Sequence, residues 1–169
     1  MAEVLLELQP DSAKYDPGIQ PPQLRLIDGT NLSYPGLFFD AGTIETCFFF
    51  FRAGRYPNAG NLSIDIEWVA DTATSGNVVW GAAIAAVTPE TDTGSTDSKA
   101  FATENTVTDG HLGTNARRIM LCTVSVSNLD SLATNDWVVL RIRRVANDGG
   151  DTMSGDAGIV KVSVRYSDT

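Results

Sequence analysis

Apolar and polar residues alternate with a period of two along most of the chain after residue 43, which is typical of β-strands with one buried face. In NLSIDIEWVADT (61–72), every second residue from Leu62 to Ala70 is apolar, and most of the residues between them are polar. GNVVWGAAIAAV (76–87) is continuously apolar instead, which predicts a strand that is buried on both faces. Seven strands are expected from residue 43 onward, and strands in the N-terminal segment bring the count to eight or nine; the other five of the seven span 43–52, 100–107, 116–128, 136–146 and 157–168.

Turns rich in Gly, Asp, Asn and Thr separate these runs, and the only helical signal is one short turn at SNLDSLAT (127–134). Many strands of similar length without helices indicate an all-β protein. We therefore predict an antiparallel β-sandwich, of the jelly-roll type, over residues 43–169.

The run ETCFFFFR (45–52) raises the question of what covers four consecutive phenylalanines. Alternation places Phe48 and Phe50 on one side of a strand and Phe49 and Phe51 on the other, and the sandwich covers only one side. Because no helix is available for the second side, we expect another subunit to cover it in a homotrimer, with Arg52 at the rim. The chain's own N-terminal segment is the alternative.

The N-terminal segment, residues 1–42, is rich in proline, since five of the seven prolines fall within the first 35 residues. Proline removes a backbone donor and disfavours helix, so we predict an extended arm with strand-forming patches at 3–8 and 23–28. Leu5, Leu24 and Leu26 in these patches are expected to contact a neighbouring subunit by adding a strand to its sheet edge.

Composition narrows the classes of partner. The chain has 169 residues, enough for one domain, and a formal net charge of −9 with three lysines, which opposes binding to nucleic acid. No apolar stretch reaches 18 residues, and Glu3 and Glu7 replace the basic start of a signal peptide. We expect a soluble protein, made in the cytoplasm and without a membrane partner, in which Cys47 and Cys122 are buried free thiols.

Residues suited to catalysis are sparse. His111 is the only histidine and has no nucleophile near it in the sequence, and nucleotide-binding and zinc-binding motifs are absent. A glycosidase needs two carboxylates in a groove, for which Glu45, Asp65 and Glu67 are candidates, but the sequence does not distinguish them from surface charges. We expect no enzymatic activity and no cofactor.

Two further clusters have a functional and a structural interpretation. In NDGGDTMSGD (147–156), Asp148, Asp151 and Asp156 are weak candidates for calcium ligands, but the spacing is not that of an EF-hand, and turn formation is the preferred explanation. In RIRR (141–144), the arginines are suited to carboxylate contacts, either between subunits or within the chain.

The C-terminal part of the chain resembles a jelly-roll module found in tailed-bacteriophage virion proteins. That module has a short helical turn, an acidic pair that leads into a V-x-L-x-I/V-x-R strand, a DT-x-x-GDA loop and a final V-x-V-x-Y strand. IDIEWVADTATSGNVVWGAAI (64–84) is similar to paired strands of the same proteins, and the likeness covers about residues 43–168. The other matching pieces are Asn135-Asp136, Leu140 to Arg144, Asp151-Thr152, Gly155 to Ala157 and Val162 to Tyr166.

This resemblance implies a non-catalytic structural protein of the virion. With room for one sandwich and an arm, the chain is expected to be a head decoration, or cement, protein that binds the major capsid protein or other virion proteins at the capsid surface. A tail-fibre or receptor-binding protein is the alternative. A carbohydrate-binding β-sandwich is another, for which Trp137 is the tryptophan expected at the surface, while Trp68 and Trp80 are expected in the core.

Overall fold

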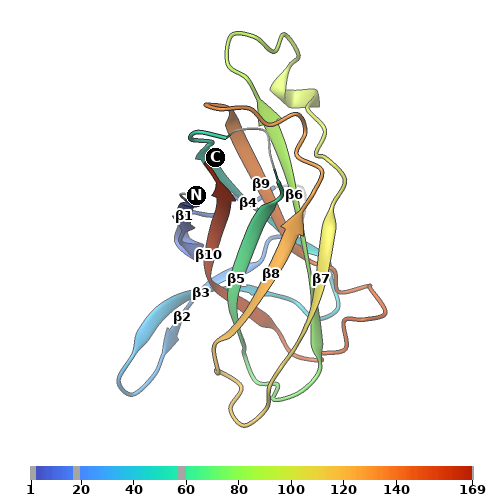
Figure 1. Ribbon diagram of the computed structural model, residues 1–169. Helices are drawn as coiled ribbons and strands as arrows, with labels where there is room; N and C mark the ends of the chain where they lie inside the picture. Colours follow the sequence, from blue (N-terminus) through green and yellow to red (C-terminus); the bar gives the residue numbers. More distant parts are fainter. Residues whose placement is uncertain (1–2, 17–19, 57–59, 169) are drawn as a thin grey trace.

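Two antiparallel β-sheets pack face to face in the computed structural model, which describes residues 3–16, 20–56 and 60–168 (Figure 1). The six strands of sheet A are β1 (Glu3–Leu8), β2 (Gln23–Asp28), β3 (Ser33–Phe39), β5 (Leu62–Ala70), β8 (Met120–Val126) and β10 (Ala157–Ser167). The four strands of sheet B are β4 (Glu45–Arg52), β6 (Asn77–Val87), β7 (Asn105–Gly110) and β9 (Trp137–Arg144). The only helical segments in the described ranges are the 3₁₀ turns η1 (Pro10–Ser12) and η2 (Thr96–Ser98).

The strand order confirms the predicted fold class. From β3 onward, the chain passes between the sheets so that β3-β10-β5-β8 form one layer and β4-β9-β6-β7 the other, which is the order of a jelly roll. The expected strands are present, but the one predicted at 100–107 lies later, at Asn105–Gly110. The predicted helical turn at 127–134 is wrong: Asp130 and Ser131 have φ values of 52° and 60°, which a right-handed helix does not accept.

Alternating side chains from both sheets fill the core. Trp68 and Trp80 are completely buried, as expected, and lie edge to face with ring centroids 6.3 Å apart. Both cysteines are free and buried, as predicted. Burial raises the pKa of the Cys122 thiol to about 12, so this side chain contributes packing and not nucleophilic chemistry.

The N-terminal segment is built into sheet A, which corrects the prediction of a separate extended arm. β1 pairs antiparallel with β10, from Glu3 opposite Ser167 to Leu8 opposite Val162, and its inward side chains pack on the core. β2 and β3 form a hairpin whose second strand pairs with the start of β10. The prolines did not prevent this pairing: Pro10, Pro21 and Pro22 lie between strands, and Pro35 lies within β3, opposite Leu26. Residues 1–2 and 17–19 of the segment lie outside the described ranges.

The turn after β1 also protects an edge of sheet B. The backbone N–H of Lys14 donates to the carbonyl of Phe48, and the N–H of Phe48 donates to the carbonyl of Lys14, both at 2.8 Å. An edge strand without such a cover is open to pairing with other chains. The N-terminal segment therefore completes one sheet and shields part of the other.

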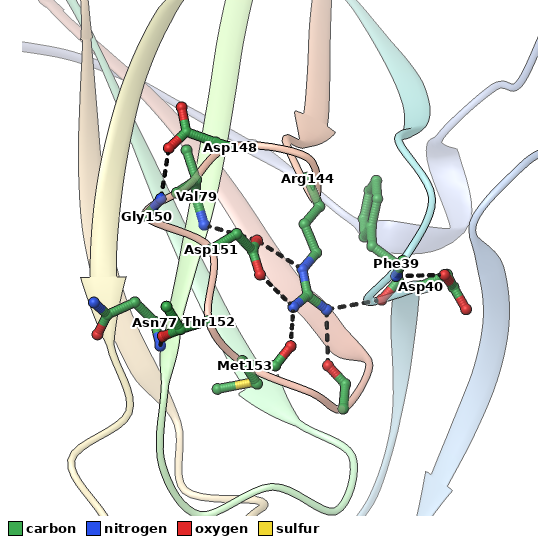
Figure 2. A network of polar contacts seen from close by, with 12 residues as sticks. Phe39, Asp40, Asn77, Val79, Arg144, Asp148, Gly150, Asp151, Thr152 and Met153 are labelled. Carbon is green, nitrogen blue, oxygen red and sulfur yellow. Dashed lines mark hydrogen bonds and ion pairs between the residues drawn. The ribbon is translucent and has the colours of Figure 1, made fainter.

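A buried ion pair closes the end of the sandwich where β9 stops. Val138, Leu140 and Ile142 point into the core from β9, and Arg144 takes the next inward position with no exposed surface. Its Nε and one terminal nitrogen donate to the two carboxylate oxygens of Asp151, at 2.9 and 2.7 Å (Figure 2). This two-point contact satisfies both charges inside the protein.

The same guanidinium holds the loop between β9 and β10. It donates to the carbonyls of Met153 at 2.7 Å and Gly155 at 2.8 Å. Arg144 therefore binds the loop backbone at two points in addition to the Asp151 side chain. Asp151 in turn accepts from the backbone N–H of Val79 at 3.1 Å, which ties the loop to β6. The loop, the start of β6 and the end of β9 are thus joined through one buried arginine.

We expect Asp151→Asn to lower the free energy of unfolding by about 3–5 kcal/mol, because it leaves the charge of Arg144 buried without a counter-charge. Asp148→Asn is the matched control: among the described residues, the Asp148 carboxylate accepts only from the N–H of Gly150, at the exposed side of the same loop. It should change the free energy by less than about 0.5 kcal/mol. Urea unfolding of the three proteins measures both values, and equal effects would contradict this account of the loop.

Candidate functional site

The phenylalanine run divides between the core and the outer face of sheet B. Phe49 is buried in the core and Phe51 packs against it, so these two residues are the pair that enters the sandwich, and Phe48 and Phe50 are the pair left for an interface. Phe48 and Phe50 point outward. Arg52 follows at the exposed end of β4, where its Nε donates to the carbonyl of Asn135 at 3.3 Å.

A segment of the same chain covers Phe48. The ring of Phe101 stacks on that of Phe48 with centroids 5.8 Å apart. The Arg141 guanidinium lies 4.7 Å from the centroid of the Phe101 ring. The backbone N–H of Ala102 donates to the carbonyl of Ile84 at 2.9 Å, which fixes this segment on β6. The cover of Phe48 is therefore the loop before β7, and neither another subunit nor the N-terminal segment.

Small residues on β6 make room for this cover. Gly81, Ala83 and Ala85 occupy its outward positions, and a Cβ on Gly81 would lie 2.7 Å from the carboxyl carbon of Glu104. This explains why β6 is apolar throughout and confirms that it is buried on both faces. The alternation of small residues was the signal in the sequence for a covering segment.

Two of the arginines of RIRR are paired within the chain at this face. Glu104 accepts from Arg143 at 2.6 and 2.8 Å and from Arg141 at 3.3 Å. The intrachain alternative of the sequence analysis is thus the one found in the structure, and Arg144 of the same run forms the buried pair with Asp151.

Beside the covered part, an apolar depression stays open on the outer face of sheet B. We call it the aromatic groove; it has a volume of about 210 Å³ and is lined by Phe48, Ala85, Val87, Phe101, Trp137 and Val139, with Thr96 and Lys99 at one end. Phe50 stacks on Trp137, with ring centroids 5.7 Å apart. Phe50 is 44% and Trp137 is 39% exposed, so Trp137 is the surface tryptophan, as predicted.

A second hollow adjoins the aromatic groove. It has a volume of about 420 Å³, lies within the loop of residues 87–100, and shares Val87, Thr96 and Lys99 with the groove. Its other lining residues are mostly hydroxyl-bearing or acidic, among them Asp92, Thr93 and Ser95. The two hollows together reach the size of ordinary small-molecule sites, about 300–1,000 Å³.

A further exposed apolar surface lies on the β2–β3 hairpin. Leu24 is 48% and Leu26 is 66% exposed. Leu24 stands directly opposite Leu37, which is a core residue, and Leu26 stands opposite Pro35. Opposite residues of an antiparallel pair point to the same side, so these leucines continue the core-facing side of sheet A beyond the sandwich. Leu5 is also exposed, but on the outward side of β1.

The candidate calcium ligands do not converge. Asp151 is held by Arg144, Asp148 accepts from the N–H of Gly150, and Asp156 accepts from Arg25 at 2.6 Å. No group of three or more potential ligand side chains forms a metal site among the described residues. The weak calcium hypothesis is therefore replaced by three separate structural contacts, in line with the preferred explanation of this segment as a turn.

The candidate catalytic carboxylates lie on different sheets. Asp65 is bound by Arg165 and by the hydroxyl of Thr123; partial burial acts to raise its pKa, but these hydrogen bonds lower the pKa below its usual value. Burial raises the pKa of Glu45, which lies on β4 and accepts from the N–H of Asp40. Glu67 shares the outer side of β5 with Asp65. No acid and base pair emerges from these three residues.

His111 is held in a loop by ordinary contacts. Its Nδ1 accepts from the N–H of Gly113 at 3.0 Å, and its Nε2 lies 3.1 Å from the carbonyl of Ala116. Its ring packs edge to face against Trp68, with centroids 6.1 Å apart. The histidine thus shapes the turn before β8.

No helix in the described part of the chain is long and apolar enough to cross a membrane.

Comparisons with known proteins give likenesses of fold. No family model matches the sequence, and no curated protein matches it. A carbohydrate-binding module specific for non-crystalline cellulose is 10% identical, with a TM-score of 0.47, over 90% of this chain and 84% of that one. A cleaved adhesin domain of Lys-gingipain from Porphyromonas gingivalis W83 is 14% identical, with a TM-score of 0.45, over 97% and 99%.

A carbohydrate esterase from the Shiga toxin-encoding bacteriophage phi24B is also similar. It is 12% identical, with a TM-score of 0.38, over 92% of this chain and 89% of that one. These identities and TM-scores are too low to carry an argument about this chain. The likenesses give no grounds for assigning the ligand or the activity of any of them to this chain.

We expect the melting temperature of the protein to be the same in excess calcium and in excess chelator, because the three aspartates of the 147–156 loop are used by protein donors. Differential scanning calorimetry in both conditions measures this. A ligand that binds only the folded state raises the melting temperature, so a calcium-dependent rise of several degrees, absent in Asp148→Asn, would contradict the prediction.

Proposed function

We propose that this chain is a non-catalytic structural protein of a bacteriophage virion, which decorates the head and attaches there through the β2–β3 hairpin. The observation that carries the proposal is the exposed apolar side of this hairpin, which projects away from the two packed sheets (Figure 1). The partners proposed are the major capsid protein and other copies of this chain. The place of action proposed is the capsid surface, after synthesis in the host cytoplasm.

The hairpin has the geometry of an attachment element. Leu24 and Leu26 lie on the core-facing side of sheet A but are largely exposed, so an apolar surface begins at buried Leu37 and continues into solvent. β2 is also the terminal strand of its sheet. An open edge next to exposed leucines offers a partner both backbone hydrogen bonds and apolar contact, as in strand addition.

The root of the hairpin is fixed before any partner binds. Arg25 donates to Asp71 at 2.9 Å and to Asp156 at 2.6 Å, and its guanidinium lies 4.1 Å above the ring of Phe38. On the same side, Ile27, Phe38 and Val69 form a small buried cluster separate from the main core. A preorganised element loses less conformational entropy on binding, which favours affinity for a given contact area.

The resemblance to virion proteins supports the choice of a virion over other assemblies. Several residues that carry it have framework roles in this fold: Asp151 and the carbonyl of Gly155 bind Arg144, and Asp156 binds Arg25. The residues on which the resemblance rests therefore include ones that position the hairpin in this chain. The proposal includes no catalytic step and no cofactor, and the homotrimer expected from the phenylalanine run stays a prediction.

We expect the double substitution Leu24→Ser, Leu26→Ser to abolish attachment to virions while the protein stays folded, because both side chains are solvent-exposed in the isolated chain. Leu121→Ser is the matched control, since Leu121 is 62% exposed on β8, at the other edge of sheet A. Co-sedimentation with heads assembled without this protein measures attachment, and thermal unfolding monitors the fold.

Point substitutions are needed here, because deletion of the N-terminal segment would also remove β1 and β2 from sheet A. If the double variant still saturates the heads with wild-type affinity, the hairpin is not the attachment element. If neither the wild-type chain nor the control binds heads, the assignment to the head is wrong.

A further inference from the structure

The aromatic groove and the adjoining hollow form one surface that is apolar and aromatic at one end and rich in hydroxyl groups at the other. We infer that this surface binds a neutral oligosaccharide, with one sugar ring stacked on the indole of Trp137. The inference is independent of the attachment surface proposed above, because the hairpin belongs to sheet A and the groove lies on the outer face of sheet B.

Trp137 is presented as a platform. Phe50 stacks on it with an angle of 23° between the ring planes and so occupies one face of the indole. Trp137 also lines the groove, which leaves its other face for a ligand there. Phe50 is a positioning residue in this arrangement: it supports the indole from the neighbouring strand β4 and does not line the groove itself.

The polar end of the surface supplies the hydrogen-bonding groups that a sugar needs. A pyranose carries C–H groups on its faces and hydroxyl groups around its rim, so it needs an aromatic surface and hydrogen-bonding groups side by side. The side-chain hydroxyls of Thr93 and Thr96 make no hydrogen bond with other described residues. One oxygen of Asp92 accepts from the N–H of Thr88 at 2.9 Å, and the other oxygen is open to a hydroxyl donor.

The charges around the site favour a neutral sugar. Lys99, which is shared by the groove and the hollow, is paired with Asp130 at 2.9 Å. Arg141 and Arg143 are paired with Glu104. Lys99 is the only cation among the residues that line the groove and the hollow, and it is already paired, while Asp92 adds a negative charge to the hollow. Arg52 stands opposite Trp137 and donates to the carbonyl of Asn135, but it does not line either hollow, so an acidic sugar would lack a lining counter-charge.

The area of the aromatic pair argues against a second copy of the chain as the occupant. A large aromatic side chain buries about 150–250 Å² when fully covered, so the exposed fractions of Phe50 and Trp137 amount to less than about 200 Å². A stable protein interface buries about 800 Å² on each partner. The pair is large enough to stack with one or two sugar rings and too small to hold a subunit alone.

The experiment uses the full chain on an array of neutral gluco-, galacto- and manno-oligosaccharides, with uronic-acid oligosaccharides as the charged comparison. The neutral oligosaccharide that binds most tightly is then titrated against the protein while acrylamide quenching of tryptophan fluorescence is followed. Trp68 and Trp80 are fully buried, so quenching reports on Trp137. We expect the oligosaccharide to protect Trp137 from acrylamide.

Variants locate the binding. In isothermal titration, Trp137→Ala should weaken binding on the order of 30-fold or more, the effect of a central contact residue. Phe50→Ala should weaken it less, and Leu121→Ala should bind as the wild type does. If Trp137→Ala fails to fold, Trp137→Leu replaces it, since leucine keeps the apolar contact and removes the aromatic face.

Three results would overturn the inference. They are the absence of any binding to neutral oligosaccharides, tighter binding of the uronic-acid series, and sugar binding that survives at Trp137→Ala. A loss of self-association or virion attachment in Trp137→Ala, with no sugar bound by the wild type, would identify the groove as a protein contact instead. If the hairpin variants still attach to virions, the attachment proposal is wrong, but the test of sugar binding is unaffected. The two proposals can therefore be contradicted separately.

Discussion

The pairing of Arg144 with Asp151 is the contact on which most other features of this structure depend. Taking a guanidinium and a carboxylate out of water is expensive, and the arrangement is stable only because nearly every donor and acceptor is satisfied inside the fold. The result is that an irregular loop behaves as a fixed part of the framework. Asp156, at the end of that loop, can then hold Arg25, and Arg25 fixes the hairpin. One charge pair at the end of β9 thus determines where a distant strand points.

The outer face of sheet B is organised by a different principle. Small residues on β6 allow the segment around Phe101 and Glu104 to lie flat on the sheet, and two arginines of β9 hold its carboxylate. This cover stops short of Trp137. The boundary between the covered and uncovered parts creates the groove, so its shape follows from the position of the loop and not from a gap in the core.

The sequence was sufficient for the fold class and for the inward positions of most strands, because a period of two is a local property. The partner of Arg144 was not predictable, since a turn rich in Asp, Asn and Gly has the same composition whether its carboxylates bind calcium, water or an arginine. The pairing of the N-terminal segment was not predictable for a related reason: prolines disfavour helix, but they do not say which strand the segments around them pair with, and Pro35 itself lies within β3. The role of Phe101 depended on a contact between residues 53 positions apart in the chain, Phe48 and Phe101.

The pairing of β1 with β10 has a mechanical consequence. Glu3 and Ser167 stand side by side, so the start of β1 and the end of β10 lie close together (Figure 1). A force that separates the two ends would therefore load the hydrogen bonds between these strands one pair at a time, as a zipper opens, and not all at once in shear. β1 would peel away first, while the eight strands from β3 to β10 kept their order. Tension applied through the termini would meet little resistance at its first step, whereas tension applied between the hairpin and either terminus would be transmitted along sheet A.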